Sequence, residues 1–214
     1  MRQPMTSSTF ARATALPLLI TLFVPAAAAA RQAGSVATDD IFAALNIREG
    51  STVCEMGAGD GELTLAVAKR VGPNGRVYSS ELGEDRIKAL RGKIGGERSH
   101  VVVIAGDSAK TNFPDAACDA LFMRNVYHHF ADPPVMNASI AAALKPSARL
   151  AIVDFTPPPG TEAACPADRG KDGMHGITAA TLSRELADAG FQAVSTTAGA
   201  QRWFMIVVAK PEPK

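Results

Sequence analysis

A glycine-rich turn between an apolar run and a helix-type run has the clearest chemical potential in this sequence. It reads Glu55-Met56-Gly57-Ala58-Gly59-Asp60-Gly61. Glycine has no Cβ, so Gly57, Gly59 and Gly61 can adopt positive φ and leave room for a ligand beside the backbone. The first N–H groups of the following helix point to the same place. The turn, with Ala58 and its two acids, therefore predicts a nucleotide-like ligand.

The spacing and the acids of this turn narrow the ligand class. The glycines follow the pattern Gly-x-Gly-x-Gly, whereas dinucleotide enzymes use Gly-x-Gly-x-x-Gly. Carboxylates at Glu55 and Asp60 would repel a diphosphate but tolerate or attract a cation. The turn thus favours a sulfonium cofactor over NAD.

Carboxylates also follow the next two predicted strands. Glu81 stands near the offset expected of an acid that accepts both hydroxyls of a ribose. Asp107, with its neighbour Ser108, can accept a hydrogen bond from an exocyclic amine such as that of adenine. The alternatives are a solvated turn acid for Glu81 and a helix N-cap for Asp107.

The fourth predicted strand ends in a dense polar segment, Arg124-Asn125-Val126-Tyr127-His128-His129-Phe130. We expect Arg124 beside the cofactor and either His129 or His128 as a general base, because imidazole titrates near neutral pH. A lone histidine there would more often be structural. The expected substrate contacts are Asn125, Tyr127, Asp154 and His175.

No metal site is predicted from this pattern. Adjacent histidines rarely bind one ion together, and no set of His, Cys and carboxylate residues shows ligand spacing.

Strand-type and helix-type runs alternate along the chain, which predicts an α/β fold with a parallel sheet. Strands are expected near 51–56, 76–80, 100–105, 118–123 and 149–155, and helices near 38–45, 61–71, 84–94 and 134–145. A helix from Thr178, with Thr178 as N-cap, and a terminal hairpin near 191–197 and 202–209 follow. The loop 156–176 is long enough to be a functional lid.

The N-terminus has the order of a secretory signal peptide. Arg2 and Arg12 precede an apolar run and then the alanine tract 26–30. We therefore expect a signal peptide at 1–30, a linker at 31–37 and one domain at 38–210. The protein would be exported, either periplasmic or secreted, without stable membrane association after cleavage. An uncleaved membrane anchor is the alternative.

The charge and the cysteine content argue against two other classes of protein, those that bind nucleic acid and those built on a disulfide framework. The net charge of +1 over 214 residues gives no electrostatic footprint for nucleic acid. Three cysteines without Cys-x-x-Cys spacing argue against a disulfide framework. We expect Cys54 and Cys118 to be small buried hydrophobes, and Cys165 to lie in an open loop. Oligomeric state is not indicated.

Over about residues 38–209 the sequence resembles the class I S-adenosylmethionine-dependent methyltransferases. The resemblance implies that the glycine turn wraps the methionine part of S-adenosyl-L-methionine, Glu81 binds its ribose and Asp107 contacts its adenine. It also implies a Rossmann-like, doubly wound, mostly parallel seven-stranded sheet of order 3-2-1-4-5-7-6 with strand 7 antiparallel. The segment 124–130 is similar to that of ubiquinone and menaquinone C-methyltransferases. The Pro-interrupted stretch 108–114 predicts a loop in place of the usual helix.

The sequence thus favours methyl transfer from S-adenosylmethionine to a small molecule. A non-catalytic binding protein for this cofactor and a protein methyltransferase remain open. An NAD-dependent oxidoreductase is disfavoured by the spacing of the turn and by Glu55.

Overall fold

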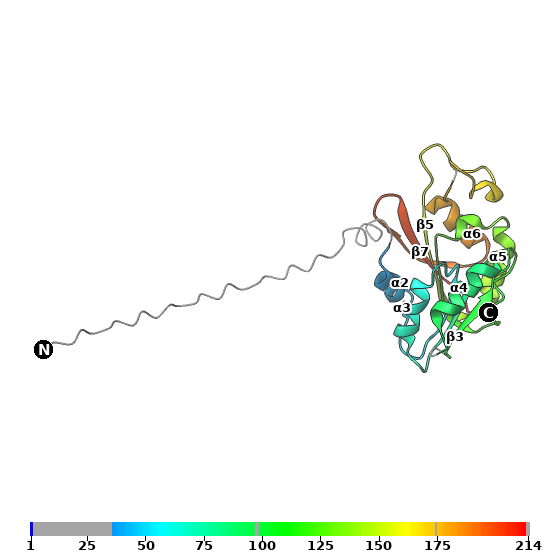
Figure 1. Ribbon diagram of the computed structural model, residues 1–214. Coiled ribbons are helices and arrows are strands. Elements are labelled where there is room, and N and C mark those ends of the chain that lie inside the picture. Colours follow the sequence, from blue (N-terminus) through cyan, green and yellow to red (C-terminus); the bar gives the residue numbers. More distant parts are fainter. Residues whose placement is uncertain (2–35, 97–98, 174, 213–214) are drawn as a thin grey trace.

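A computed structural model describes residues 1, 36–96, 99–173 and 175–212, and its centre is a sheet with helices on both faces (Figure 1). The predicted signal peptide and most of the predicted linker lie outside the described residues. Export is therefore still a prediction.

The sheet has seven strands in the order β3-β2-β1-β4-β5-β7-β6. The first five in chain order pair in parallel, and β7 runs antiparallel to both β5 and β6. The predicted order and the antiparallel seventh strand are both confirmed. The strands are β1 (Thr52–Met56), β2 (Arg76–Glu81), β3 (Val101–Ala105), β4 (Cys118–Arg124), β5 (Leu144–Phe155), β6 (Gln192–Ala198) and β7 (Trp203–Ala209).

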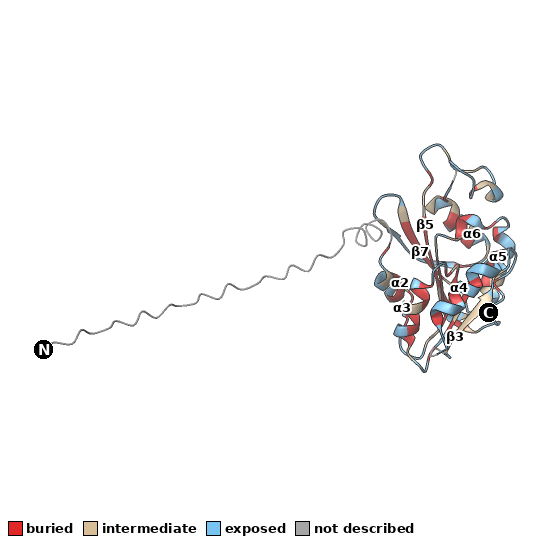
Figure 2. Cartoon of the chain, in the orientation of Figure 1, coloured by how far each residue is buried: buried red, intermediate tan, exposed pale blue. Residues whose placement is uncertain are grey.

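Helices form one layer on each face of the sheet, and buried residues are concentrated in the central strands and in parts of the helices beside them (Figure 2). The side chains of α2 (Thr38–Ala44) and α3 (Glu62–Val71) pack with one face of the central strands, and α4 (Glu84–Ile94) adjoins them. The other face packs with α5 (Pro133–Ala143) and α6 (Ala179–Asp188). Thr178 caps α6 as predicted, because its side chain accepts a hydrogen bond from Thr181 N at 3.2 Å.

Alternation along β1 decides which layer each site residue faces. Successive side chains of a strand point to opposite faces. Val53 accordingly packs among residues of α2 and α3, whereas Cys54 and Met56 pack among residues of α5 and α6. Glu55 shares the face of Val53, and the α3 residue Thr64 donates a hydrogen bond to it.

Two boundaries differ from the sequence-based expectation. β5 begins at Leu144 and follows α5 directly, because a register shift between Cys118 and Ala120 lets Leu144 pair with Cys118. The stretch between β3 and β4 contains no helix among residues 106–117, all of which are described. The predicted loop there is confirmed.

Cys54 and Cys118 form a disulfide between β1 and β4, so the expectation of two unpaired buried cysteines was wrong. The odd number of cysteines suggested that none is paired, but it reflects one free cysteine, Cys165, beside one disulfide. Cys165 is exposed, as expected. The pairing follows from topology, since the order 3-2-1-4 makes β1 and β4 neighbours. In the described part of the chain, no helix has the length and hydropathy needed to cross a bilayer.

Candidate functional site

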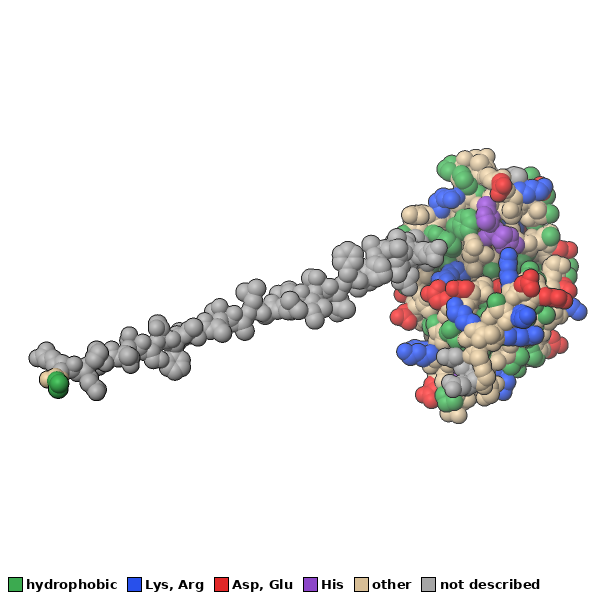
Figure 3. All heavy atoms as spheres, viewed as in Figure 1, with side chains coloured by type: hydrophobic (Ala, Val, Ile, Leu, Met, Phe, Trp, Pro, Cys, Tyr) green, Lys and Arg blue, Asp and Glu red, His purple; other side chains and the backbone are tan. Residues whose placement is uncertain are grey.

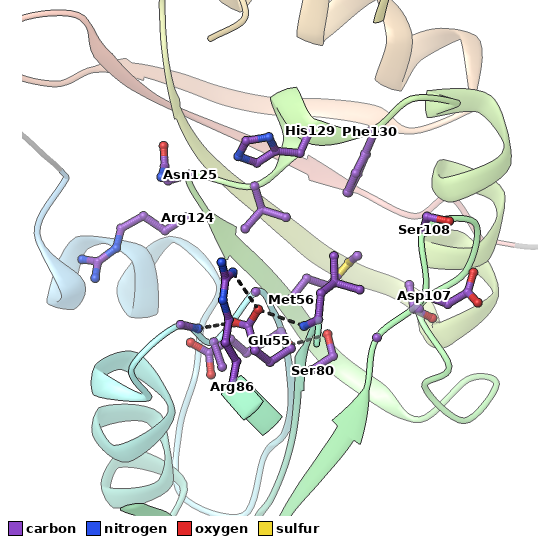
Figure 4. Close-up of a pocket in the computed structure, with 18 of the residues that line it drawn as sticks. Glu55, Met56, Ser80, Arg86, Asp107, Ser108, Arg124, Asn125, His129 and Phe130 are labelled. Atoms are coloured by element: carbon purple, nitrogen blue, oxygen red, sulfur yellow. Dashed lines mark hydrogen bonds and ion pairs between the residues drawn. The ribbon is translucent and has the colours of Figure 1, made fainter. Parts of the chain in front are cut away.

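A cavity of about 730 Å³ opens at the carboxyl ends of β1, β2, β3 and β4, where ligands bind in doubly wound sheets. Figure 4 shows His129 and Phe130 along one wall, Glu55 and Ser80 at the opposite side, and Asp107 and Ser108 on the loop after β3. The predicted site residues that line it are Glu55, Gly57, Ala58, Gly59, Asp60, Glu81, Asp107, Ser108, Arg124, Asn125 and His129.

The glycine turn follows β1 and lies against β2. Gly57 N and Ala58 N both donate to Ser80 O, at 3.0 and 2.9 Å. Gly57 has φ +73°, and a Cβ there would lie 2.3 Å from Val126 Cγ2. Gly59 also has positive φ, but a Cβ there would meet nothing within 4 Å. Gly57 is therefore required by packing inside the protein, whereas Gly59 leaves open space beside the cavity.

Gly61 does not line the cavity, although we predicted it to contact the cofactor. It is the N-cap of α3 with φ +78°, and a Cβ there would lie 2.7 Å from Leu90 Cδ1. Its lack of a side chain allows α3 and α4 to approach each other.

Glu81 ends β2 with its carboxylate turned toward the glycine turn. Gly59 N donates to Oε2, and Leu82 N donates to Oε1 at 2.8 Å. The side chain is only 6% exposed, and Arg86 Nη1 lies 3.7 Å from Oε1. A carboxylate fixed in this way still has acceptor capacity for a diol, because it offers about four lone-pair sites.

Glu55 lies under the glycine turn and is held by hydroxyl groups. Ser79 Oγ donates to Oε2 at 2.9 Å, and Thr64 Oγ1 donates to the same oxygen. Burial raises the pKa of Glu55 to about 7, although both hydroxyls oppose that shift. From the sequence we treated Glu55 as a fully ionised carboxylate that repels anions. With a pKa of about 7, its charge near neutral pH depends instead on the ligand.

Asp60 is an exposed acid at the mouth of the cavity. Its Oδ1 accepts from Glu62 N at 3.2 Å, and its Oδ2 lies 3.5 Å from Lys93 Nζ. The hydrogen bond from Glu62 N holds the pKa of Asp60 below its usual value. Asp60 is therefore ionised near neutral pH and places a negative charge beside the glycine turn.

Residues after β3 and β4 close two further sides of the cavity. Asp107 Oδ1 accepts from Ala109 N at 2.8 Å, but no helix follows among residues 106–117, so the alternative that Asp107 is a helix N-cap was wrong. Arg124 Nη2 lies 3.7 Å from Glu62 Oε2. Asn125 has φ +62° and donates through its N–H to Val153 O at 2.8 Å, so the chain turns sharply as it leaves β4.

The far end of the cavity combines apolar side chains with one imidazole. Val126, Phe130 and Met136 line it together with His129. Burial, and then the neighbouring His128 and His175, hold the pKa of His129 below its ordinary value. His129 is therefore the cavity-lining group that is best placed to act on a second ligand.

His128, predicted as an alternative general base, and Asp154, predicted as a substrate contact, are fully buried, contact each other and do not line the cavity. His128 Nδ1 lies 2.8 Å from Asp154 Oδ1, and His128 N donates to Oδ2 at 3.2 Å. His128 Nε2 lies 2.7 Å from His175 Nε2. His175 is exposed and contacts His128 outside the cavity lining.

Tyr127, which we predicted as a substrate contact, does not line the cavity either. Its side chain is fully buried, and its hydroxyl accepts a hydrogen bond from Asn137 Nδ2 at 2.9 Å. It therefore belongs to the core between β4 and α5.

The loop 156–176, described apart from residue 174, is anchored to α6. Arg169 forms a bidentate ion pair with Glu185. Thr178 Oγ1 and Thr181 Oγ1 both donate to Glu162, at 2.9 and 2.7 Å. The loop also reaches His129, because a Cβ on Gly170 would lie 3.1 Å from His129 Nδ1. It therefore packs beside the far end of the cavity, where His129 lies.

Three histidines come together in space, although the spacing along the sequence indicated no such set. The loop brings His175 to His128 and His129, and one nitrogen of each lies within 4.8 Å of the others. Spacing could not reveal this set, because its third member is 47 residues from His128.

Sequence reasoning also missed the two hydroxyl residues that hold Glu55 under the glycine turn. Thr64 and Ser79 could have been found as hydroxyl residues on otherwise apolar faces of α3 and β2. Neither of these two lines the cavity, and the lining residues that we did not predict are Met56, Leu63, Ser80, Leu82, Arg86, Gly106, Lys110, Thr111, Val126, Phe130, Ala131 and Met136.

Comparison with known proteins gives a family match over most of the chain. The sequence profile of the family described as "Methyltransferase domain" matches residues 29–196. The ubiquinone/menaquinone biosynthesis C-methyltransferase of Saccharophagus degradans is 31% identical over 114 residues, which cover 52% of this chain and 46% of that protein. The chain thus spans about half the length of the curated relatives that it matches.

Solved structures share the fold. An S-adenosylmethionine-dependent methyltransferase from Aquifex aeolicus aligns with a TM-score of 0.68 and 22% identity, over 80% of this chain and 88% of that one. Phosphoethanolamine N-methyltransferase 2 of Haemonchus contortus, in complex with S-adenosyl-L-methionine, aligns with a TM-score of 0.66 and 14% identity, over 82% and 52%.

Proposed function

The chain belongs to the family described as "Methyltransferase domain", and on that premise we propose that it is an S-adenosylmethionine-dependent methyltransferase whose acceptor is a small molecule. The observation that carries the proposal is the continuity of one cavity. Glu81 and Asp107 line it at one end, and His129, Phe130 and Met136 line it at the other. A volume of about 730 Å³ is in the range of small-molecule sites.

The residues at the first end fit the cofactor. The turn at Gly59 leaves space that a Cβ would enter, and Glu81 offers acceptor sites at the end of the neighbouring strand. We propose that Glu81 accepts from the ribose hydroxyls, and that Asp107 and Ser108 contact the adenine. When bound, S-adenosylmethionine supplies a methyl group on a positively charged sulfur.

The residues at the second end define the acceptor class. An acceptor that is mostly apolar would suit this end, because Val126, Phe130 and Met136 line it. The imidazole of His129 lines the same end and would contact the acceptor. We propose an apolar acceptor with a hydroxyl or an acidic C–H group that contacts His129. Such a molecule is consistent with the relatives that are named as ubiquinone/menaquinone biosynthesis C-methyltransferases. The protein's contribution is chiefly to align donor and acceptor.

Methyl-labelled cofactor tests this proposal. The protein would be incubated with labelled S-adenosylmethionine and an apolar metabolite extract, and the small-molecule and protein fractions would be separated by chromatography. We expect label in the small-molecule fraction with the natural protein and none with Glu81→Ala. Label confined to the protein fraction would contradict a small-molecule acceptor.

We also propose that the protein is exported. The Cys54–Cys118 disulfide supports this, because structural disulfides persist mainly in oxidising compartments. Mass spectrometry of the protein from its native host should find a mature N-terminus near residues 29–31. A chain that retains Met1 and stays in the cytosolic fraction would contradict export.

A further inference from the structure

Three of the four histidines of the chain meet at the junction of η1 (Tyr127–His129) and the loop 156–176. The space-filling view shows histidine side chains gathered on one face of the molecule (Figure 3). The rings of His128 and His129 have centroids 4.0 Å apart, and those of His128 and His175 are 4.5 Å apart. Imidazoles packed this closely would repel one another if protonated.

Asp154 fixes which nitrogen of His128 is available. Its carboxylate accepts from Phe155 N at 2.8 Å and from the His128 backbone and Nδ1. With Asp154 as the acceptor, Nδ1 of His128 is the donor of this hydrogen bond, and the lone pair of Nε2 is then available to a ligand. A carboxylate behind an imidazole is the support that metal-binding histidines commonly have.

The lone pair of His128 Nε2 points at His175, whose Nε2 lies 2.7 Å away. Two imidazole nitrogens at this distance share one proton between them, and a cation can take the place of that proton. In a tetrahedral zinc site with Zn–N bonds of about 2.0 Å, ligand nitrogens are about 3.3 Å apart. Small side-chain rotations would therefore convert the contact into a shared ligand pair.

We propose that His128, His129 and His175 form a binding site for a divalent transition-metal ion, with Asp154 as the residue that orients His128. Three neutral nitrogen donors suit zinc, cobalt, nickel or copper and do not suit magnesium or calcium, which prefer oxygen. Three protein ligands leave one position open on a tetrahedral ion. The ion would lie beside the cavity, because His129 lines it.

Metal binding would join two separate segments of the chain. His128 and His129 belong to η1, whereas His175 belongs to the loop. The loop already packs on His129 through Gly170, so the ion would fasten a contact that the fold provides. This site does not depend on the proposed acceptor, because its test measures the metal and not methyl transfer.

The test is calorimetric titration of the chelator-treated, untagged full-length chain with zinc chloride, and the absorption spectrum with cobalt chloride as a second readout. We expect one ion per chain, and visible bands of cobalt in nitrogen coordination. His175→Ala is the main variant, since His175 is exposed and its loss should leave the fold intact. It should weaken binding at least about tenfold, and Asp154→Asn should weaken it by about 10- to 100-fold.

Two controls make the outcome decisive. His100→Ala removes the histidine outside the cluster and should bind zinc like the parent. Cys165→Ser removes the exposed free thiol and should also keep full affinity. Circular dichroism would verify folding of each variant. Absence of zinc binding, equal affinity in His175→Ala, or loss of binding in Cys165→Ser would overturn the proposal.

Discussion

Ser79 donates a hydrogen bond of 2.9 Å to the buried carboxyl of Glu55, directly under the glycine turn. Glu55 is a titratable group that lies between β1, β2 and α3, and its pKa is about 7. The unfolded chain would ionise the same group near its ordinary value of 4.5. The protonation state of Glu55 therefore links stability to pH.

The contribution of Glu55 to stability should fall as the pH rises from 5 to 8. In this window folded Glu55 retains a proton that the unfolded chain has lost, so deprotonation costs the folded state free energy. A pKa difference between 4.5 and about 7 corresponds to roughly 3 kcal/mol at about 1.4 kcal/mol per unit. Urea unfolding at both pH values would measure it. Glu55→Gln should flatten the dependence, and an unchanged slope in that variant would refute the assignment.

The same group should make cofactor affinity depend on pH. A cationic ligand nearby favours the ionised carboxylate, so the affinity for S-adenosylmethionine should increase as the pH rises through about 7. S-adenosylhomocysteine lacks the sulfonium charge and should respond less. Calorimetry with both ligands at pH 6 and 8 is the measurement. Equal pH responses of the two ligands would contradict a role for the charge of Glu55.

Replacement by alanine should mainly reduce stability at Gly57 and mainly reduce cofactor affinity at Gly59. Gly57→Ala places a Cβ against Val126 and should destabilise the fold by at least about 2 kcal/mol. Gly59→Ala meets open space, so it should cost only about 1 kcal/mol of backbone strain and should mainly reduce cofactor affinity. Thermal melts and cofactor titrations of the two variants make the comparison. Equal loss of stability would show that the packing account is wrong.

The disulfide should make the protein sensitive to reductant. Replacing both Cys54 and Cys118 by alanine should lower the free energy of unfolding by about 2–5 kcal/mol, while Cys165→Ser should leave it unchanged. Alkylation of the denatured, unreduced protein should modify one thiol, which mass spectrometry would detect. Modification of all three cysteines would contradict the bond.

His129→Ala should lower turnover while leaving the dissociation constant of the cofactor nearly unchanged. The reason is that His129 stands at the apolar end of the cavity, opposite the glycine turn. His100→Ala is the matched control, because the ring of His100 lies near Ala68 O and away from the cavity. Steady-state kinetics with the identified acceptor would separate the two effects. Parent-level turnover in His129→Ala would remove this residue from the reaction.

The sheet was predictable because each element of it is encoded locally. Apolar runs bounded by turn residues marked the strands, and the resemblance supplied their order. The glycine turn, Glu81 and Asp107 were predictable for the same reason, since the carboxyl ends of parallel strands meet at one edge.

The directions of individual side chains were not predictable. Tyr127, His128 and His129 are consecutive, yet the first two point into the core and the third reaches the cavity, because η1 turns them differently. The pairing of His128 with His175 depends on how the loop folds back, and the pairing of Cys54 with Cys118 depends on the crossover that places β4 beside β1. Neither relationship leaves a signal in local sequence.

A crystal structure with S-adenosylhomocysteine would test the central claim most directly, namely that one cavity holds the cofactor at the glycine turn and the acceptor at His129. We predict ribose hydroxyls on Glu81, adenine beside Asp107, and the sulfur directed toward His129 and Phe130. A nucleoside bound elsewhere, or a sulfur directed away from His129, would contradict the account.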